Sequence, residues 1–332
     1  MVKEVLENYL NTSGKLTSLT IELNTTCNLK CCHCYVSNRK KVDKHFILSF
    51  DLVKKVLKEA KELGVFKISF TGGEPLLHPN IFEILEMAKN MNFFVFLKTN
   101  ATLINENNID KIRKNVDFVI TSRYGYSKQT FEKVTGIKGS FLKYQRALNL
   151  LENNDVPYKE NGILLRENEI EIDQFLQSQI QVEKYISFNF QDDYVEMHKP
   201  NDETLKKCYK RILEKRNYKE NNFMIENGVC NCGKCSLTIN AMGEINPCTN
   251  FYYSLGAVAN NSLDEVWKSS KIKQLIEKCK FKYFEKCNNC DNKKYLLSIS
   301  PCTNYTETKN INDVSSEMCR HCNIIKEIMN EI

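Results

Sequence analysis

Four cysteines lie within eight positions near the start of the chain, at Cys27, Cys31, Cys32 and Cys34 in the segment TTCNLKCCHCY. Disulfides, zinc sites, redox pairs and iron–sulfur clusters all use thiols grouped in this way. The local spacing provides three ligands, with Cys32 and His33 beside them, whereas structural zinc usually takes four ligands. An iron–sulfur cube held by only three thiolates would leave one iron open for a further ligand.

The composition favours metal chemistry over disulfides. The chain has 332 residues and 15 cysteines, an odd number that fits poorly with complete pairing. No apolar run approaches the roughly 20 residues of a membrane span. The first residues, MVKEVLENYLNTSGK, lack the apolar core of a signal peptide. We therefore expect a cytoplasmic protein, and in reducing compartments clustered thiols more often bind metal.

The net charge of +6 is spread along the chain, with lysines beside Asp and Glu in most amphipathic segments. This pattern is typical of solvated helix faces, so we expect neither a nucleic-acid nor a membrane partner. The basic segment 203–220 is the one stretch where a polyanionic partner remains an alternative.

Short apolar runs alternate with amphipathic segments through the first two hundred residues. Strands are predicted over 18–23, 66–72, 92–100, 117–122, 157–165 and 183–190, and helices over 49–63, 80–91, 105–115, 140–154 and 169–179. This alternation predicts an α/β fold with a parallel sheet. From about residue 220 the rhythm fades and ten cysteines follow, which is typical of a small module held by metal. We predict domains over 1–215 and 216–332.

Polar and glycine residues follow several predicted strands, where ligands gather in parallel α/β folds. Gly72 and Gly73 permit close approach of a backbone to a ligand, and Glu74 adds a carboxylate; a plain Gly-Gly turn is the alternative. Asn100 lies at the end of the third strand. There it could contact a ligand, and capping a turn is an equal alternative. Arg166 and Asn168 follow the fifth strand, and Asn168 could instead cap a helix.

The CxxxCxxC pattern in CNLKCCHCY, followed by GGE after the second strand, resembles the radical S-adenosylmethionine superfamily. The resemblance implies that Cys27, Cys31 and Cys34 hold a 4Fe–4S cluster, since Cys31 rather than Cys32 keeps the family spacing. The open iron would chelate S-adenosylmethionine, whose reductive cleavage gives a 5′-deoxyadenosyl radical that removes hydrogen from a substrate. A zinc site is the alternative.

The same resemblance implies further cofactor contacts. His33 stands where the family has an aromatic residue and would contact adenine, and Gly72–Glu74 would bind the methionine amino group. Asn100 lies in a segment similar to the family's TNG, facing cofactor or substrate, although Ala101 replaces the glycine and disfavours a left-handed turn. Ser122 corresponds to a ribose contact. Arg166 and Asn168 would lie at the cofactor end of the sheet.

The cysteine-rich tail resembles the SPASM module, which implies two auxiliary 4Fe–4S clusters. Gly243 followed by Cys248 gives the module's GxxxxC element, but the later spacing departs from its pattern. Zinc ribbons are the alternative, and Cys208 and Cys279 are interpreted as free thiols. The predicted ligands are Cys230, Cys232, Cys235, Cys248, Cys287, Cys290, Cys302, Cys319 and Cys322.

The resemblance implies a partial (β/α)6 TIM barrel, open on one side, followed by the SPASM-like domain. Such tails mostly accompany peptide substrates, so the leading hypothesis is a peptide maturase that forms a thioether or carbon–carbon crosslink or a Cα epimer. Its partners would be a precursor peptide and a flavodoxin- or ferredoxin-like electron donor. Because only a short extension precedes the first strand, a separate leader-binding protein is a further expectation.

Two alternatives remain. One is an enzyme of the same class that acts on another protein, as a sulfatase maturase does, or on a small molecule. The other is an iron–sulfur electron carrier, which would have no need of Gly72, Gly73 and Glu74 at a strand end.

Overall fold

A curved nine-stranded sheet organises the chain in the computed structural model, which describes residues 14–34, 36, 45–178, 181–183, 197–216, 230, 232–296 and 299–331. The strand order is β6-β5-β4-β3-β2-β1-β7-β8-β9, and all pairs from β6 to β7 are parallel. The strands are β1 Ser18–Glu22, β2 Lys67–Thr71, β3 Phe94–Lys98, β4 Phe118–Arg123, β5 Tyr158–Ile163, β6 Gln181–Glu183, β7 Ser236–Ile239, β8 Glu244–Asn246 and β9 Gly256–Ala257.

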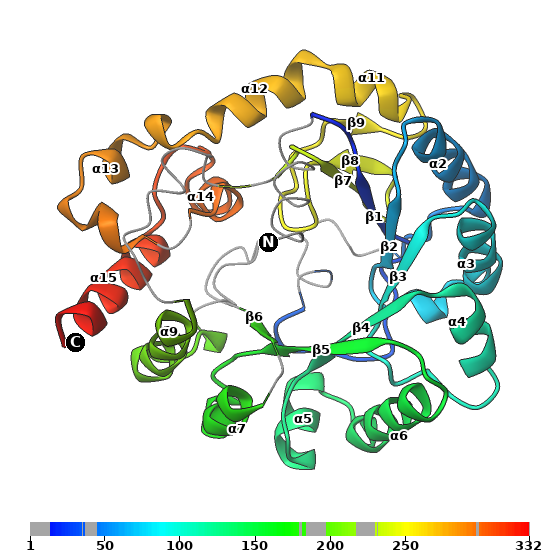
Figure 1. The fold of residues 1–332 in the computed structure, drawn as a ribbon, viewed down its shortest axis with the longest axis horizontal. Helices are drawn as coiled ribbons and strands as arrows, with labels where there is room; N and C mark the ends of the chain where they lie inside the picture. The colour runs from blue at the N-terminus through cyan, green and yellow to red at the C-terminus, as the bar shows by residue number, and fades with distance from the viewer. Residues whose placement is uncertain are drawn as a thin grey trace.

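Helices lie outside the curved sheet, as Figure 1 shows for α2 to α7. The barrel helices are α2 Phe50–Glu62, α3 Ile81–Asn90, α4 Ile109–Asn115, α5 Lys128–Thr135, α6 Ser140–Asn153 and α7 Ile172–Gln177, with 3₁₀ turns η1 Pro75–Leu77 and η2 Glu169–Glu171. Local signals set their ends: the Ser49 hydroxyl accepts a hydrogen bond from the Leu52 amide at the start of α2. The buried face of α2 packs Val53 and Leu57 against the sheet. The predicted parallel α/β fold is confirmed.

Strand β1 is an interior strand of the sheet, because β2 pairs with one of its edges and β7 with the other. In register, Ile21 lies opposite Phe70 on β2 and Ile239 on β7. The antiparallel strands β8 and β9 then continue the sheet. The sheet and its core therefore extend across the predicted domain boundary between residues 215 and 216. The boundary itself stays a prediction.

One helix was not predicted, and one predicted strand lies mostly outside the described residues. No helix is predicted between the strand at 117–122 and the helix at 140–154, but residues 128–135 form α5, which begins at the Ser127 cap and ends at Gly136 in the left-handed conformation. The helix is short, so its apolar pattern is weak, and the cap signals were the available clue. Strand β6 covers 181–183, whereas the prediction was 183–190; residues 184–190 lie outside the described residues.

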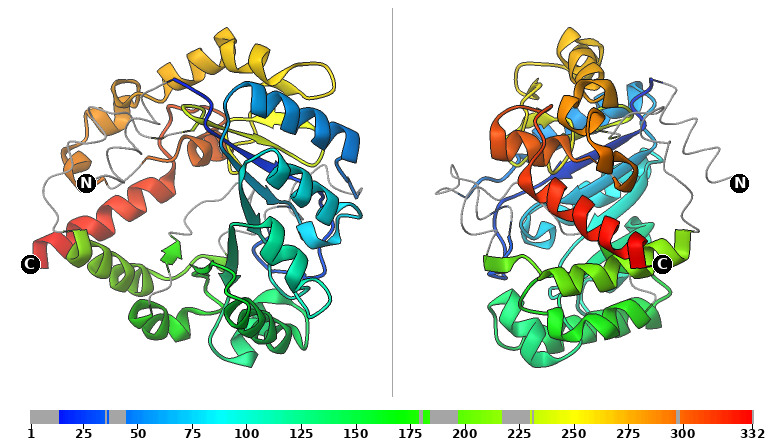
Figure 2. Two further views of the ribbon diagram at one scale, coloured as in Figure 1. Left: turned by 45° about the vertical axis from the view of Figure 1, so that its right-hand side comes forward. Right: turned by 90° about the vertical axis from the view of Figure 1, so that its left-hand side faces the viewer.

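The C-terminal part follows the sheet and closes back toward the barrel (Figure 2). Its helices are α9 Asp202–Arg216, α11 Leu263–Lys268, α12 Ser270–Lys278, α13 Glu285–Asn288, α14 Pro301–Thr308 and α15 Ser316–Glu331, with 3₁₀ turns η3 Phe281–Tyr283 and η4 Asp291–Tyr295. Leu205 and Tyr209 of α9 pack against Ile325 and Ile328 of α15. A separate apolar cluster around Phe251 and Phe284 contains several of the tail cysteines, so thiols and aromatic rings share one small core.

The basic segment at 203–220 is described as far as Arg216. Lys206 and Lys210 on α9 pair with Glu327 and Glu331 of α15, at 2.5 and 2.8 Å. These pairs account for part of its positive charge, as the prediction of a solvated helix face requires. Of the helices that the structure describes, none has the length and apolar character needed to cross a membrane.

The interior position of β1 predicts a large difference in stability between Ile21→Ala and Ile170→Ala, two variants that remove the same side-chain atoms. Ile21→Ala removes a side chain that is 0% exposed, and we expect it to lower the free energy of unfolding by about 2–5 kcal/mol. Ile170→Ala removes a side chain that is 87% exposed, and it should change stability by less than about 0.5 kcal/mol. Anaerobic thermal unfolding of both variants checks this; equal melting temperatures would contradict the interior placement of β1.

Candidate active site at the carboxyl ends of the strands

A cavity of about 530 Å³ lies at the carboxyl ends of the barrel strands. Residues from the loops after β1 and β2 and from the ends of β3, β4 and β5 form its wall. Eight of the residues that the sequence singled out line it together: Cys27, Cys31, His33, Cys34, Gly72, Gly73, Asn100 and Ser122. Segments far apart in the sequence thus converge on one space.

The helix that the sequence did not predict holds the cysteine loop in place. The amides of Lys30 and Cys32 donate to the carbonyls of Thr135 and Val134 at the end of α5, at 2.9 and 3.0 Å. A Cβ on Gly136 would lie 2.8 Å from the Lys30 carbonyl oxygen, so only glycine permits this approach. The end of α5 therefore fixes the backbone that carries the thiols.

The thiols of Cys27, Cys31 and Cys34 line the same cavity and lie close enough for their charges to interact. Burial raises the pKa of Cys31 well above its usual value, and the charges of Cys34 and Cys27 raise it further. Burial likewise raises the pKa of Cys27 to about 11, although the Leu29 amide donates to its sulfur at 3.4 Å. Burial also raises the pKa of Cys32 to about 12, but its main electrostatic neighbour is Glu167. Cys31 interacts most strongly with Cys34 and Cys27, whereas Cys32 interacts most strongly with Glu167, which favours Cys31 as the ligand.

The spacing of these thiols fits a cluster better than a single ion. Among the described residues, the one set of three ligands with atoms within 4.8 Å of one another is Cys32, Glu167 and His198. The thiols of Cys27, Cys31 and Cys34 are therefore more widely spaced than the ligands of one zinc ion, while a 4Fe–4S cube is large enough to span them. The donor set fits three corners of such a cube.

Gly72 and Gly73 bring the loop after β2 into contact with the loop after β1. The Gly73 amide donates to the Asn24 carbonyl at 2.8 Å. A Cβ on Gly73 would lie 2.3 Å from the Thr26 carbonyl oxygen, and one on Gly72 would lie 2.4 Å from that of Asn24. Both glycines are thus required by the close approach of two backbones, and both also line the cavity.

Glu74 acts within the protein, because its side chain is not part of the cavity wall. Its carboxylate is 0% exposed and accepts hydrogen bonds from the Leu76 amide, the Thr99 hydroxyl and the Asn100 amide, at 3.0, 2.7 and 2.8 Å. Burial raises the pKa of this carboxyl to about 7 in spite of these donors. The carboxylate therefore joins the end of β2 to the end of β3.

Asn100 is held in a network beside the first thiol. Its side-chain nitrogen donates to the Asn28 side-chain oxygen at 2.9 Å and lies 3.7 Å from the Cys27 sulfur. Its side-chain oxygen accepts from the Thr102 amide at 3.0 Å. The intervening Ala101 has φ 64°, so the left-handed turn that alanine was expected to disfavour is present. That expectation was wrong, because these hydrogen bonds offset a cost of about 1–2 kcal/mol.

Tyr124 is a site residue that the sequence reasoning missed. It follows β4, lines the cavity and lies 5.2 Å from the His33 ring, centroid to centroid. Burial and then the neighbouring Cys31 raise its pKa well above the usual value, and it shares hydrogen bonds with Ser122 and the Cys31 sulfur. The clue in the sequence was an aromatic residue directly after a strand end.

His33 presents an unsatisfied polar atom at the cavity. Its Nδ1 is buried and has no hydrogen-bond partner, and burial lowers the pKa of the ring to about 3. A neutral imidazole with an unused nitrogen at this wall fits a site built for a bound group, since buried polar atoms normally find partners.

Arg166 and Asn168 are not among the residues that line the cavity. The Asn168 side chain is fully buried; its nitrogen donates to the carbonyls of Tyr124 and Ile163, and its oxygen accepts from the Leu165 amide. Asn168 thus fixes the loop that carries Tyr124. The cofactor contacts expected of Arg166 and Asn168 stay predictions, without support from the cavity wall.

Further lining residues were not predicted. Lys98, Lys159 and Asn161 come from β3 and β5. Thr249 and Asn250 come from the C-terminal part, directly after the predicted ligand Cys248. The tail therefore supplies part of the cavity wall.

The tail cysteines form two groups. Cys232 shares hydrogen bonds with Cys230 and Cys248. Burial, and then the charges of Cys230 and Cys248, raise the pKa of Cys279. Cys279, which was interpreted as a free thiol, therefore lies close to this first group. The second group consists of Cys287, Cys290, Cys319 and Cys322: burial, and then the charges of the other thiols in the group, raise the pKa of Cys287 to about 11 and that of Cys322 to about 12. Four thiols would satisfy all four irons of a cube.

The Glu74 network predicts that a near-isosteric change weakens the site. In Glu74→Gln an amide nitrogen replaces one acceptor oxygen, so a buried donor loses its partner, and we expect a stability loss of about 1–3 kcal/mol. The matched change Glu86→Gln alters an exposed side chain and should leave stability nearly unchanged. Anaerobic thermal unfolding of both variants checks this. A Glu74→Gln protein as stable as the Glu86→Gln protein would contradict the stabilising role of the Glu74 hydrogen bonds.

Curated relatives are distant, and this chain matches only part of each. The antilisterial bacteriocin subtilosin biosynthesis protein AlbA of Bacillus subtilis is 25% identical over 81% of this chain and 63% of its own length. The PqqA peptide cyclase of Gluconobacter oxydans is 29% identical over 46% of this chain and 42% of its own. The chain therefore spans less than two thirds of the length of these relatives.

Solved structures share the fold over almost the whole chain. Native anSMEcpe with bound AdoMet and Cp18Cys peptide matches with a TM-score of 0.70 and 18% identity, covering 95% of this chain and 96% of that one. Streptococcus suis SuiB bound to precursor peptide SuiA matches with a TM-score of 0.66 and 18% identity, covering 96% and 79%. At this identity the likeness shows the fold alone.

Two family models match the two parts of the chain. Residues 21–178 match the radical SAM superfamily, and residues 230–291 match SPASM, an iron–sulfur cluster-binding domain. Domains of these families bind 4Fe–4S clusters. The chain therefore contains a radical SAM domain followed by a SPASM domain.

Proposed function

We propose that this protein is a peptide maturase, which removes a hydrogen atom from a ribosomally synthesised peptide to start a thioether or carbon–carbon crosslink or a Cα epimerisation. The observation that carries the proposal is a single cavity lined both by Cys27, Cys31 and Cys34 and by Thr249 and Asn250 of the SPASM domain. A substrate there would lie between the two parts of the chain.

The residues of the chain have distinct roles in this proposal. Cys27, Cys31 and Cys34 hold the cluster, and the backbones of Gly72 and Gly73 approach S-adenosylmethionine. When bound, the cluster and S-adenosylmethionine supply hydrogen-atom abstraction. The protein positions the reactants and excludes water from the cavity.

The side chains around the cavity add orientation. Asn100 is placed by the carboxylate of Glu74 and contacts the Cys27 sulfur. Tyr124 and Ser122 form the wall at the end of β4, and His33 faces Tyr124. Lys98 and Lys159 supply positive charge from the barrel, which suits a peptide carboxylate or an acidic side chain.

The comparisons support a peptide substrate more than a small molecule. AlbA, which is described as a bacteriocin biosynthesis protein, matches 81% of this chain. A probable GTP 3′,8-cyclase of Saccharolobus islandicus matches only 49% of it. Two solved structures with the same fold, anSMEcpe and SuiB, hold peptides. Auxiliary clusters would accept the second electron of a crosslinking oxidation, which favours crosslinking over epimerisation.

The partners and the location belong to the proposal as well. The clusters require an electron donor of the flavodoxin or ferredoxin type, and a separate leader-binding protein would present the precursor peptide. The cysteine content favours the cytoplasm, where thiols stay reduced.

Removing the three thiols that line the cavity tests the cofactor site. In anaerobically reconstituted protein, the triple change Cys27→Ala, Cys31→Ala and Cys34→Ala should abolish 5′-deoxyadenosine formation and lower iron by about four atoms per chain. The iron of the SPASM domain should persist. Cys208→Ala alters a buried thiol on α9 and serves as the control. Continued 5′-deoxyadenosine formation in the triple variant would refute the assignment.

Mass spectrometry of a short peptide encoded beside this chain tests the substrate class. Anaerobic co-expression should remove a pair of hydrogen atoms for each crosslink. An epimerised peptide would keep its mass in water and gain deuterium from heavy water. A peptide that changes in neither respect, with enzyme that cleaves S-adenosylmethionine, would count against peptide maturation.

A further inference from the structure

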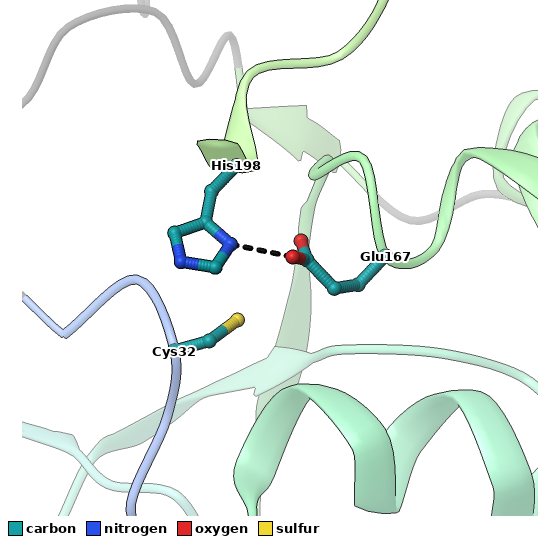
Figure 3. A group of neighbouring side chains, drawn as sticks. All are labelled: Cys32, Glu167 and His198. Carbon is teal, nitrogen blue, oxygen red and sulfur yellow. Dashed lines mark hydrogen bonds and ion pairs between the residues drawn. The ribbon is translucent and has the colours of Figure 1, made fainter. Parts of the chain in front are cut away.

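A second group of ligand-type side chains lies beside the cluster loop and outside the cavity. Cys32, Glu167 and His198 present a sulfur, a carboxylate oxygen and an imidazole nitrogen that all lie within 4.8 Å of one another. None of the three is part of the cavity wall. Figure 3 shows the thiol directed toward the space between the imidazole and the carboxylate.

The three side chains come from separate parts of the chain. Cys32 belongs to the loop after β1, whose amide is bound by Val134 at the end of α5. Glu167 belongs to the loop after β5, and His198 lies in the segment that leads to α9. The His198 carbonyl accepts a hydrogen bond from the Arg166 amide at 3.0 Å, which holds the two latter segments together. The backbone therefore fixes the group before any ligand binds.

The carboxylate is only partly satisfied. Oε1 of Glu167 lies 2.5 Å from Nδ1 of His198, and both side chains are 14% exposed. Oε2 of Glu167 is buried and has no hydrogen-bond partner. A buried carboxylate oxygen without a donor is costly unless a proton or a cation completes it.

The chemistry of the donors selects the cation. Calcium and magnesium prefer oxygen ligands, whereas zinc takes sulfur, nitrogen and oxygen together. A tetrahedral zinc ion with bonds of about 2.0–2.3 Å would hold its ligand atoms roughly 3.3–3.8 Å apart. The three ligand atoms now lie within 4.8 Å of one another, so binding requires only small side-chain shifts, in which Oε1 of Glu167 and Nδ1 of His198 move apart from their present 2.5 Å if both bind the ion.

We infer that Cys32, Glu167 and His198 form a binding site for a divalent cation of the zinc class, distinct from the three iron–sulfur clusters. Binding releases the Cys32 thiol proton to solvent. The thiolate and the carboxylate then balance the two positive charges, and a water molecule completes the fourth position. The ion joins the cluster loop to the loop after β5 and to the segment before α9, and it thereby restrains the backbone beside Cys31.

The site has a consequence for the extra cysteine. A fourth thiol next to three cluster ligands could compete with them for iron. With zinc bound, the Cys32 thiolate is a zinc ligand directed away from Cys31. The cluster loop then has one set of thiols, Cys27, Cys31 and Cys34, available to bind iron.

Zinc itself is the probe for the test. The full-length protein is purified anaerobically with its clusters, dialysed against a chelator, supplied with zinc sulfate and desalted. We expect about one zinc ion per chain, with a single sulfur neighbour at about 2.3 Å and nitrogen or oxygen neighbours at about 2.0–2.1 Å by zinc-edge X-ray absorption. This readout is independent of S-adenosylmethionine cleavage and of any peptide, so it fails or succeeds apart from the proposed function.

Variants assign the ligands. Cys32→Ser should remove the sulfur neighbour, and His198→Gln should weaken zinc retention at least about tenfold. Both should keep the iron content of the unaltered protein, which shows that the fold and the clusters persist. Cys208→Ser, a change of a buried thiol on α9, should alter neither metal. Loss of zinc retention in the unaltered protein would overturn the proposal, and so would zinc with several sulfur neighbours, since it would lie in an empty cluster site.

Discussion

The carboxylate of Glu74 is the interaction on which the rest of the site depends. It is fully buried, and it binds donors on its own turn and at the end of β3. The backbone of the same residue bonds to Thr26 and to the side chain of Asn24 at the end of β1. One residue thus joins the carboxyl ends of three adjacent parallel strands. Because the loops that follow these strands carry the thiols, the glycines and Asn100, their relative positions follow from this connection.

The cysteine loop has a second anchor that is independent of the first. Helix α5 ends where its last carbonyls accept the amides of Lys30 and Cys32. Its neighbour Gly136 leaves room for this contact because a side chain there would meet the Lys30 carbonyl. The loop is therefore held on one side by β2 and on the other by α5, which preorganises three thiols before a cluster is inserted.

Much of this arrangement could be predicted from the sequence, because it depends on local spacing and strand ends. The alternation of apolar runs predicted the parallel sheet, and its direction brought Cys27, Gly72, Asn100 and Ser122 to one cavity. The roles of individual side chains were harder to predict. Glu74 and Asn168 are predicted as cofactor contacts, and the structure adds hydrogen bonds to the Asn100 amide and the Tyr124 carbonyl that only folding brings near.

Other features were hidden because they depend on contacts between distant segments. Tyr124 has no motif of its own, and its place beside Cys31 follows from the packing of β4 against the cysteine loop. Cys32 could not be separated from Cys31 by type, only by spacing; its proximity to Glu167 gives the physical distinction. Thr249 and Asn250 reach the cavity because the tail continues the barrel sheet, which no local pattern in the sequence predicts.

The parallel pairing of β1 with β7 bears on how the chain acquires its structure during synthesis. The hydroxyl of Thr17, just before β1, bonds to Cys235, just before β7, across 218 positions of the sequence. Because the ribosome synthesises the N-terminal part first, the edge of β1 that pairs with β7 stays unpaired until most of the polypeptide has emerged. An open strand flank is prone to pair with other chains. Nascent molecules are therefore vulnerable to self-association until β7, Ser236–Ile239, has been translated and can pair with β1.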